Sequence, residues 1–308
     1  SLLIHVSAHA THAANVAAGM YPTEDPVARA RLCLSCHFGN DRKFVTHRIM
    51  GAGHPRMSFE LDTFTTIQPA HFVVDDDYKS RKKVTNGVKT WAIGQALALS
   101  TTLEAMADPK RGRDGAFPEL VLFDCQACHH SMDNLRWESR ASAGVAPGIP
   151  RINDANLIML RVIAARTAPE TATELTERGR ALHKSVMEGL GPMVEASKRL
   201  KESVDKLAEA FIKRDFTADD MAALLGALTA EGLKGEYVDY AAAEQATMAI
   251  NTVVDAMKQA GALDEAQHKA LGDAINKLYE AVAKDDAYKP ATFKTALQNF
   301  ESARPKRN

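Results

Sequence analysis

The sequence predicts an all-α fold in two parts: a first domain, residues 1–150, with short helices and little other regular structure, and a helical bundle, residues 151–308. No stretch of any length alternates apolar and polar residues as a half-buried strand does. The second half is rich in alanine, with apolar residues at helical spacing. All four cysteines and nine of the eleven histidines fall in residues 1–150, so we expect the chemistry there.

In the first domain, turn residues separate the expected helices. His5, His9 and His12 would share one side of a helix within residues 1–20. The Pro-containing segment 21–26 breaks that helix and caps the next, 27–36, which ends at the glycine-containing turn 39–41. Further helices are predicted over 58–66 and 84–107, the latter a core helix with a 3.6-residue apolar pattern. Segments 75–83 and 108–118 are predicted to be loops.

In the bundle, we expect helices near residues 153–167, 170–213, 217–232, 236–260, 264–284 and 290–302. Thr217 and Asp264 each precede acidic residues, which favours a helix start at both places. The apolar stripes on these helices, such as Leu200, Val204 and Leu207, are typical of core positions.

Two five-residue motifs use all four cysteines: Cys33-Leu34-Ser35-Cys36-His37 and Cys125-Gln126-Ala127-Cys128-His129. Each reads C-x-x-C-H, the attachment signature of a c-type haem. Two cysteines on one helical turn can each bind a vinyl group of one porphyrin, and the histidine that follows becomes the proximal ligand of the iron. The sequence therefore predicts two covalently attached haem c groups, with His37 and His129 bound to iron.

A zinc site, a redox dithiol or a pair of disulfides would account for less of the pattern. The two cysteine pairs of a zinc site are usually separated by roughly 15–20 residues, whereas 88 residues lie between Cys36 and Cys125. A thioredoxin-like dithiol would need a βαβ context, which is absent from the pattern. Two disulfides would not explain a histidine directly after each pair.

The sixth ligand of each iron must come from elsewhere in the chain. The Gly51-Ala52-Gly53-His54-Pro55 segment constrains the backbone at His54, which we favour as a distal ligand. His130 adjoins His129 and cannot reach the same iron. The other candidates are His47, His71, the amino-terminal His5, His9 and His12, and the methionines Met50 and Met57, whose thioethers would raise the potential.

The segment from Pro22 to Trp137 resembles a family of multihaem c-type cytochromes related to the tetrahaem electron carriers of ammonia oxidisers. The resemblance covers a little over a third of the chain. Its motifs, in order, are Asp25-Pro26-x-x-Arg29-Ala30, Cys33-x-x-Cys36-His37-x-Gly39, Val45-x-His47-x-x-Met50-x-Ala52-Gly53-His54-Pro55-Arg56, Phe59-Glu60-Leu61, Pro69-x-His71, and Cys125-x-x-Cys128-His129-His130 with Trp137.

This resemblance implies electron transfer through bis-histidine haems and points to His47, His54 and His71 as iron ligands. Members usually carry further C-x-x-C-H motifs upstream, which this sequence does not contain, so one of the three histidines is left without an obvious haem. Either that histidine has another role, or a haem module upstream has been lost. The region after Pro150 has no counterpart in the family.

These observations predict an exported dihaem cytochrome that passes single electrons between redox proteins, such as other cytochromes, a reductase or an oxidase. Haem attachment normally follows export, so we expect a periplasmic or otherwise exported protein whose leader has been removed. A net charge of −1 does not favour nucleic acid, and no apolar run is long enough to span a membrane. The bundle would support the haem domain, dimerise it or dock it to a partner.

Two other functions stay open. In the first, one iron lacks a sixth ligand and reduces a small molecule such as peroxide or a nitrogen oxide, because a catalytic metal needs an open coordination position. In the second, ligand exchange at a haem moves the helical bundle, and the protein is a redox or gas sensor.

Overall fold

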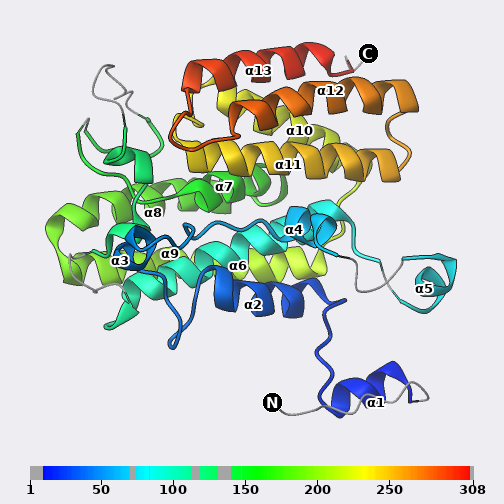
Figure 1. Ribbon diagram of the computed structural model, residues 1–308, viewed down its shortest axis with the longest axis horizontal. Helices are drawn as coiled ribbons and strands as arrows, with labels where there is room; N and C mark the ends of the chain where they lie inside the picture. The colour runs from blue at the N-terminus through cyan, green and yellow to red at the C-terminus, as the bar shows by residue number, and fades with distance from the viewer. Residues whose placement is uncertain are drawn as a thin grey trace.

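The computed structural model describes residues 10–69, 74–82, 84–111, 118–130, 140–146 and 148–305. Within these residues the chain forms thirteen α-helices and two short 3-10 helices, and contains no strand beyond one isolated bridge between Phe123 and Ile152 (Figure 1). The predicted all-α fold is confirmed. In this described part of the chain, no helix is long and apolar enough to cross a membrane.

Five short helices begin the chain. They are α1 (His12–Ala17), α2 (Pro26–His37), α3 (His47–Gly51), α4 (Leu61–Ile67) and α5 (Asp76–Arg81). In Figure 1, α1 and α2 lie at the bottom, α3 at the left, α4 near the centre and α5 at the far right. Helix α2 starts where predicted, because the Asp25 side chain accepts a hydrogen bond from the backbone N–H of Val27. The predicted loop over 75–83 is wrong in part, since α5 forms there with its charged side chains exposed.

Helix α6 (Gly87–Ala107) is the centre of the packing. It contacts α2, α4, α7, α9 and α11. Trp91, Ala92 and Ile93 are successive residues on it and are all fully buried. A helix that is buried on every side has neighbours all round it, so α6 connects the short amino-terminal helices to those that follow residue 150.

Seven longer helices complete the fold, and the upper ones stack in parallel layers in Figure 1. They are α7 (Ala155–Thr167), α8 (Pro169–Glu188), α9 (Leu190–Lys213), α10 (Ala218–Leu233), α11 (Tyr240–Gln259), α12 (Glu265–Ala281) and α13 (Pro290–Ala303). Thr217 and Asp264 begin α10 and α12 with capping boxes, as predicted. The single helix expected over 170–213 is instead two helices, because the backbone turns at Gly189, which has φ of +109°.

One continuous hydrophobic core extends from α6 to α13. A smaller cluster (Ala30, Leu34, Phe38, Phe59, Leu61 and Ala98) lies beneath the first C-x-x-C-H motif. The division into domains at residue 150 stays a prediction, and the larger core continues across that position.

A buried ionic network lies beneath the second C-x-x-C-H motif. Arg140 is 3% exposed and pairs with Asp154 at 2.5 Å and with Asp239 at 2.9 Å. Arg151 pairs with Asp124, the residue directly before Cys125, at 3.2 Å. Burial and the nearby Asp239 carboxylate raise the pKa of Asp124 to about 7. These ion pairs attach the segment that carries the second motif to the starts of α7 and α11.

Candidate functional site

The second motif lies on a single turn of 3-10 helix, η3 (Cys125–Ala127), which follows η2 (Leu120–Leu122). The Asp124 carboxylate accepts a hydrogen bond from the backbone N–H of Gln126 and so starts the turn. The backbone N–H of His129 donates to the carbonyl of Cys125 at 2.8 Å, which closes the turn. Cys125, Cys128 and His129 are exposed, and both thiols are free. The turn therefore presents two sulfurs and an imidazole together.

A cavity of about 530 Å³ opens beside this turn. Cys125, Cys128 and His129 line it on one side, and the candidate ligands His47 and His54 also line it. Pockets that bind organic cofactors have volumes of roughly 300–1,000 Å³. The candidate methionines Met50 and Met57 belong to the same lining, together with the charged residues Arg56, Asp124, Asp285 and Asp286.

His47 lies opposite His129 in this cavity. The centroids of the two imidazole rings are 6.0 Å apart and the ring planes are inclined by 27°. An imidazole nitrogen binds a metal at about 2.0–2.1 Å and lies about 1 Å from its ring centroid, so two axial imidazoles on one metal have centroids roughly 6 Å apart. The distance between the His47 and His129 ring centroids therefore matches that of two imidazoles on one iron.

The position of His47 is fixed by a contact with the segment before the second motif. The backbone N–H of His47 donates to the Glu119 carboxylate at 2.7 Å, and Glu119 is 2% exposed. The Thr46 side chain caps the start of α3. Sequence reasoning missed Glu119, since a single glutamate 72 positions from its partner carries no local signal.

His54 lies on the rim of the same cavity and is exposed. Its Nδ1 lies 2.7 Å from the carbonyl oxygen of Pro55. Because a carbonyl only accepts, this contact favours the tautomer of the neutral ring in which Nδ1 carries the proton and Nε2 has the lone pair that a metal needs. The preceding Gly53 has φ of +102°, the unusual backbone conformation that the sequence indicated. His54 is thus a second candidate ligand beside the second motif.

The first motif lies on α2, with Cys33 half-buried and Cys36 and His37 exposed. The His37 ring stacks on Phe59, with centroids 4.3 Å apart, and meets Phe64 at 5.8 Å. Burial lowers the pKa of His37, which favours the neutral imidazole that binds iron. Burial also raises the pKa of the Cys33 thiol, opposed by the nearby Arg29.

Of the remaining histidines within residues 1–150, the structure describes His12 and His130. His12 bonds to Glu24, and Lys82 lies 3.4 Å from its other ring nitrogen. His130 is half-buried beside His129. His5, His9, His71 and Trp137 lie outside the described residues. The distal ligand of the first motif therefore stays unassigned.

Groups of three or more His, Cys, Asp or Glu side chains that could hold a metal ion do not occur in the described ranges. That result does not bear on a haem, because the porphyrin supplies four of the six iron ligands and the protein only two. The donor types at the second motif, two thiols and two facing imidazoles, fit a haem c.

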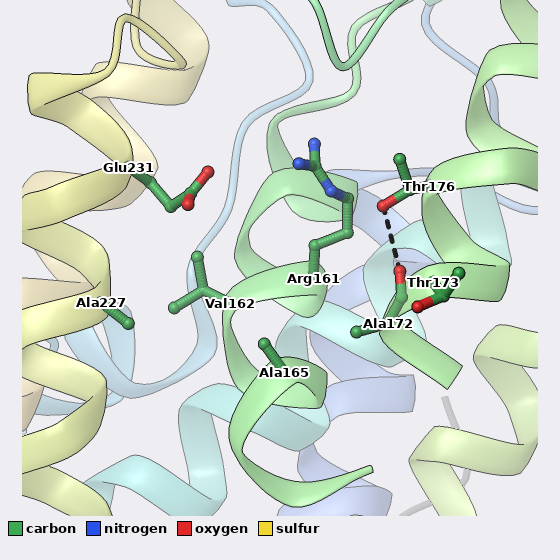
Figure 2. Close-up of a pocket in the computed structure, with 8 residues that line it drawn as sticks. All are labelled: Arg161, Val162, Ala165, Ala172, Thr173, Thr176, Ala227 and Glu231. Carbon is green, nitrogen blue, oxygen red and sulfur yellow. Dashed lines mark hydrogen bonds between the residues drawn. The ribbon is translucent and has the colours of Figure 1, made fainter. Parts of the chain in front are cut away.

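A second cavity, of about 240 Å³, lies among α7, α8 and α10. In Figure 2, Glu231 of α10 and Arg161 of α7 lie with Val162 between them, and Ala172 and Thr176 of α8 lie on the far side of Arg161. Arg161 lies 3.4 Å from Glu236. Its lining contains neither cysteine nor histidine, so this cavity offers no ligand for a haem.

No protein-family model, curated protein or solved structure matches this chain.

Proposed function

We propose that this protein is an exported dihaem c-type cytochrome that carries single electrons between redox proteins. The observation that carries the proposal is the arrangement at the second motif, where free Cys125 and Cys128 thiols and two imidazoles 6.0 Å apart line one cavity. The same motif recurs on α2. The resemblance of the chain to multihaem cytochromes supports the same function.

Each motif has a defined set of roles in this proposal. Cys33 and Cys36 hold the first haem and Cys125 and Cys128 the second, with His37 and His129 as proximal ligands. His47 is the distal ligand of the second haem, with His54 as the alternative at the same cavity. His71 is the remaining candidate for the first haem. A haem iron with two imidazole ligands supplies a one-electron couple.

The residues around the second motif favour electron transfer over catalysis at an open iron. His47 faces His129, and the cavity lining also provides His54, Met50 and Met57. A catalytic metal keeps one position free for its substrate, whereas this cavity offers several protein donors for the sixth position. The ion pair of Asp124 with Arg151 beneath the motif fixes the attachment turn in place.

Covalent attachment also supports an exported location, since haem c is normally attached after export. The proposed partners are then redox proteins of the same compartment. The helices after residue 150 support the haem-bearing segments through α6, which packs against α7, α9 and α11.

The test is spectroscopy of the purified oxidised protein, with mass spectrometry of the unfolded chain. We expect a mass increase of two haem groups, low-spin electron paramagnetic resonance signals from both irons, and no change on adding cyanide or nitric oxide. A high-spin signal that cyanide removes would instead indicate an open iron and a reductase of small molecules. A chain without covalent haem would contradict the proposal.

A further inference from the structure

Helix α2 presents one face to solvent. Its residues Pro26, Ala30 and Leu34 are buried, and the helix packs against α6. Residues four apart lie on the same side of a helix, so the opposite side carries the pairs 31 with 35 and 32 with 36. Arg31, Leu32 and Cys36 are exposed there, Leu32 with 46% of its surface. A thioether at Cys36 would therefore lie on the outer surface.

The loop after α2 folds back onto this face. The Asn40 side chain donates to the carbonyl of Ser35 at 3.3 Å and accepts from the backbone N–H groups of Arg42 and Lys43. The Lys43 ammonium lies 3.9 Å from the Cys36 sulfur. These hydrogen bonds hold the loop on α2, with the Lys43 ammonium beside the attachment cysteine and the exposed Arg42 next to it in sequence.

Gly39 allows this close return of the chain. It has φ of +81°, and a Cβ at this position would lie 2.2 Å from the carbonyl oxygen of Lys43. No residue with a side chain fits there without moving the loop. The return of the cationic loop onto α2 therefore depends on a glycine at position 39.

The segment from Pro26 to Arg48 is strongly basic in a nearly neutral chain. It contains five Arg or Lys and one acid, Asp41, a balance of 5 − 1 = +4, against −1 for all 308 residues. Arg31, Arg42 and Lys43 are exposed, and no carboxylate among the described residues forms an ion pair with any of them. Their charge is therefore available to a partner.

The second motif has the opposite charge. The exposed Asp285 and Asp286 line its cavity, and the one cation in the lining, Arg56, pairs with Glu244 at 2.6 Å. A partner with an acidic face is attracted to the first motif and repelled from the second. Charges of this kind set the orientation and rate of encounter between proteins.

We propose that Arg31, Leu32, Cys36, Arg42 and Lys43, here called the basic α2 surface, dock a redox protein that presents an acidic face, so that electrons pass at the first haem. This inference rests on the proposed function. Within the basic α2 surface, Leu32 supplies an apolar contact among cationic side chains. An apolar centre surrounded by polar residues is typical of protein interfaces. A haem bound through the exposed Cys36 would have this attachment point within the contact.

The experiment uses the complete haem-loaded protein and two oxidants of opposite charge, hexacyanoferrate(III) and tris(phenanthroline)cobalt(III). Each takes one electron from a reduced haem, which becomes ferric. The variant Arg42→Glu/Lys43→Glu is compared with the control Lys184→Glu/Lys198→Glu, whose exposed lysines lie on α8 and α9 and change the total charge equally. Stopped-flow rates are measured at low salt and at about 1 M, where the screening length falls to roughly 3 Å.

We expect the surface variant to react at least threefold more slowly with hexacyanoferrate(III) and faster with the cobalt complex at low salt, with no difference from the wild type at about 1 M. A second readout does not depend on electron transfer. A fluorescent poly-glutamate peptide should bind the wild type and the control with similar affinity, and should bind the surface variant at least threefold more weakly.

Equal rates and equal peptide binding in the surface variant and the control would overturn the docking surface while leaving the dihaem carrier intact. A chain that binds the peptide but carries no covalent haem would overturn the proposed function, and with it the redox character of the partner.

Discussion

The imidazole rings of His47 and His129 face each other across the cavity at the second motif, with centroids 6.0 Å apart. His129 reaches this position through the turn that begins at Cys125, and His47 through the start of α3. The buried Glu119 joins the two segments, because it precedes the motif and accepts the backbone N–H of His47. The pair is therefore held by backbone geometry on both sides.

Replacing His47 by alanine should remove the distal ligand of one iron. We expect His47→Ala to show one high-spin and one low-spin haem by electron paramagnetic resonance, and added imidazole to restore the low-spin signal. His54→Ala is the control, since it alters the same cavity without removing the ring that faces His129. A high-spin iron in His54→Ala but not in His47→Ala would assign the distal ligand to His54.

Glu119 should stabilise the position of His47. In Glu119→Ala the backbone N–H of His47 loses its acceptor in a partly buried position, which costs about 1–3 kcal/mol of unfolding free energy. Glu119→Gln keeps an oxygen acceptor and should lose less. Urea unfolding measures both, and equal losses in the two variants would show that the carboxylate charge, rather than this hydrogen bond, matters.

The helices could largely be predicted from sequence because their signals are local. Apolar spacing placed α6 and the later helices, and side-chain caps at Asp25, Thr217 and Asp264 set their starts. The break at Gly189 was missed, because the helical character of the flanking residues is similar on both sides and a single glycine is tolerated in many helices.

The candidate site also has a local part and a non-local part. Each C-x-x-C-H motif is a run of five residues, so the motifs can be recognised from the sequence alone. The cavity is not local: Tyr240, Asp285 and Asp286 reach it from α11 and from the segment between α12 and α13. The approach of His47 to His129 depends on how α3 packs against the Glu119 segment, and no pattern within either segment encodes that contact.

Two helical glycines should respond in opposite ways to alanine. A Cβ at Gly94, in α6, would lie 2.6 Å from the Cβ of Leu61, so Gly94→Ala should force α4 away from α6 and cost about 1–3 kcal/mol. At Gly272, in α12, no atom lies within 4 Å of the added carbon, so Gly272→Ala should gain about 0.5–1 kcal/mol. Thermal or urea unfolding measures both changes, and a stabilised Gly94→Ala would contradict the close packing of α4 on α6.

The buried Glu60 should make the protein less stable as the pH rises. Burial, together with the nearby Asp62 carboxylate, raises the pKa of Glu60 from 4.5 to about 7. Between these values the folded protein binds a proton that the unfolded chain has released, so the unfolding free energy falls with increasing pH across this interval. The full difference corresponds to about 3 kcal/mol, present below pH 4.5 and lost above pH 7.

Glu60→Gln tests this origin of the pH dependence, because glutamine does not titrate but keeps an oxygen for the N–H groups of Asp62 and Thr63 at the start of α4. Unfolding free energies at pH 5 and pH 7.5 should differ by less in the variant than in the wild type. The unfolding free energy of the variant should still fall somewhat with rising pH, since burial and Asp239 also raise the pKa of Asp124 to about 7. An unchanged slope in Glu60→Gln would mean that Glu60 stays ionised in the fold, with the two backbone N–H groups outweighing its burial.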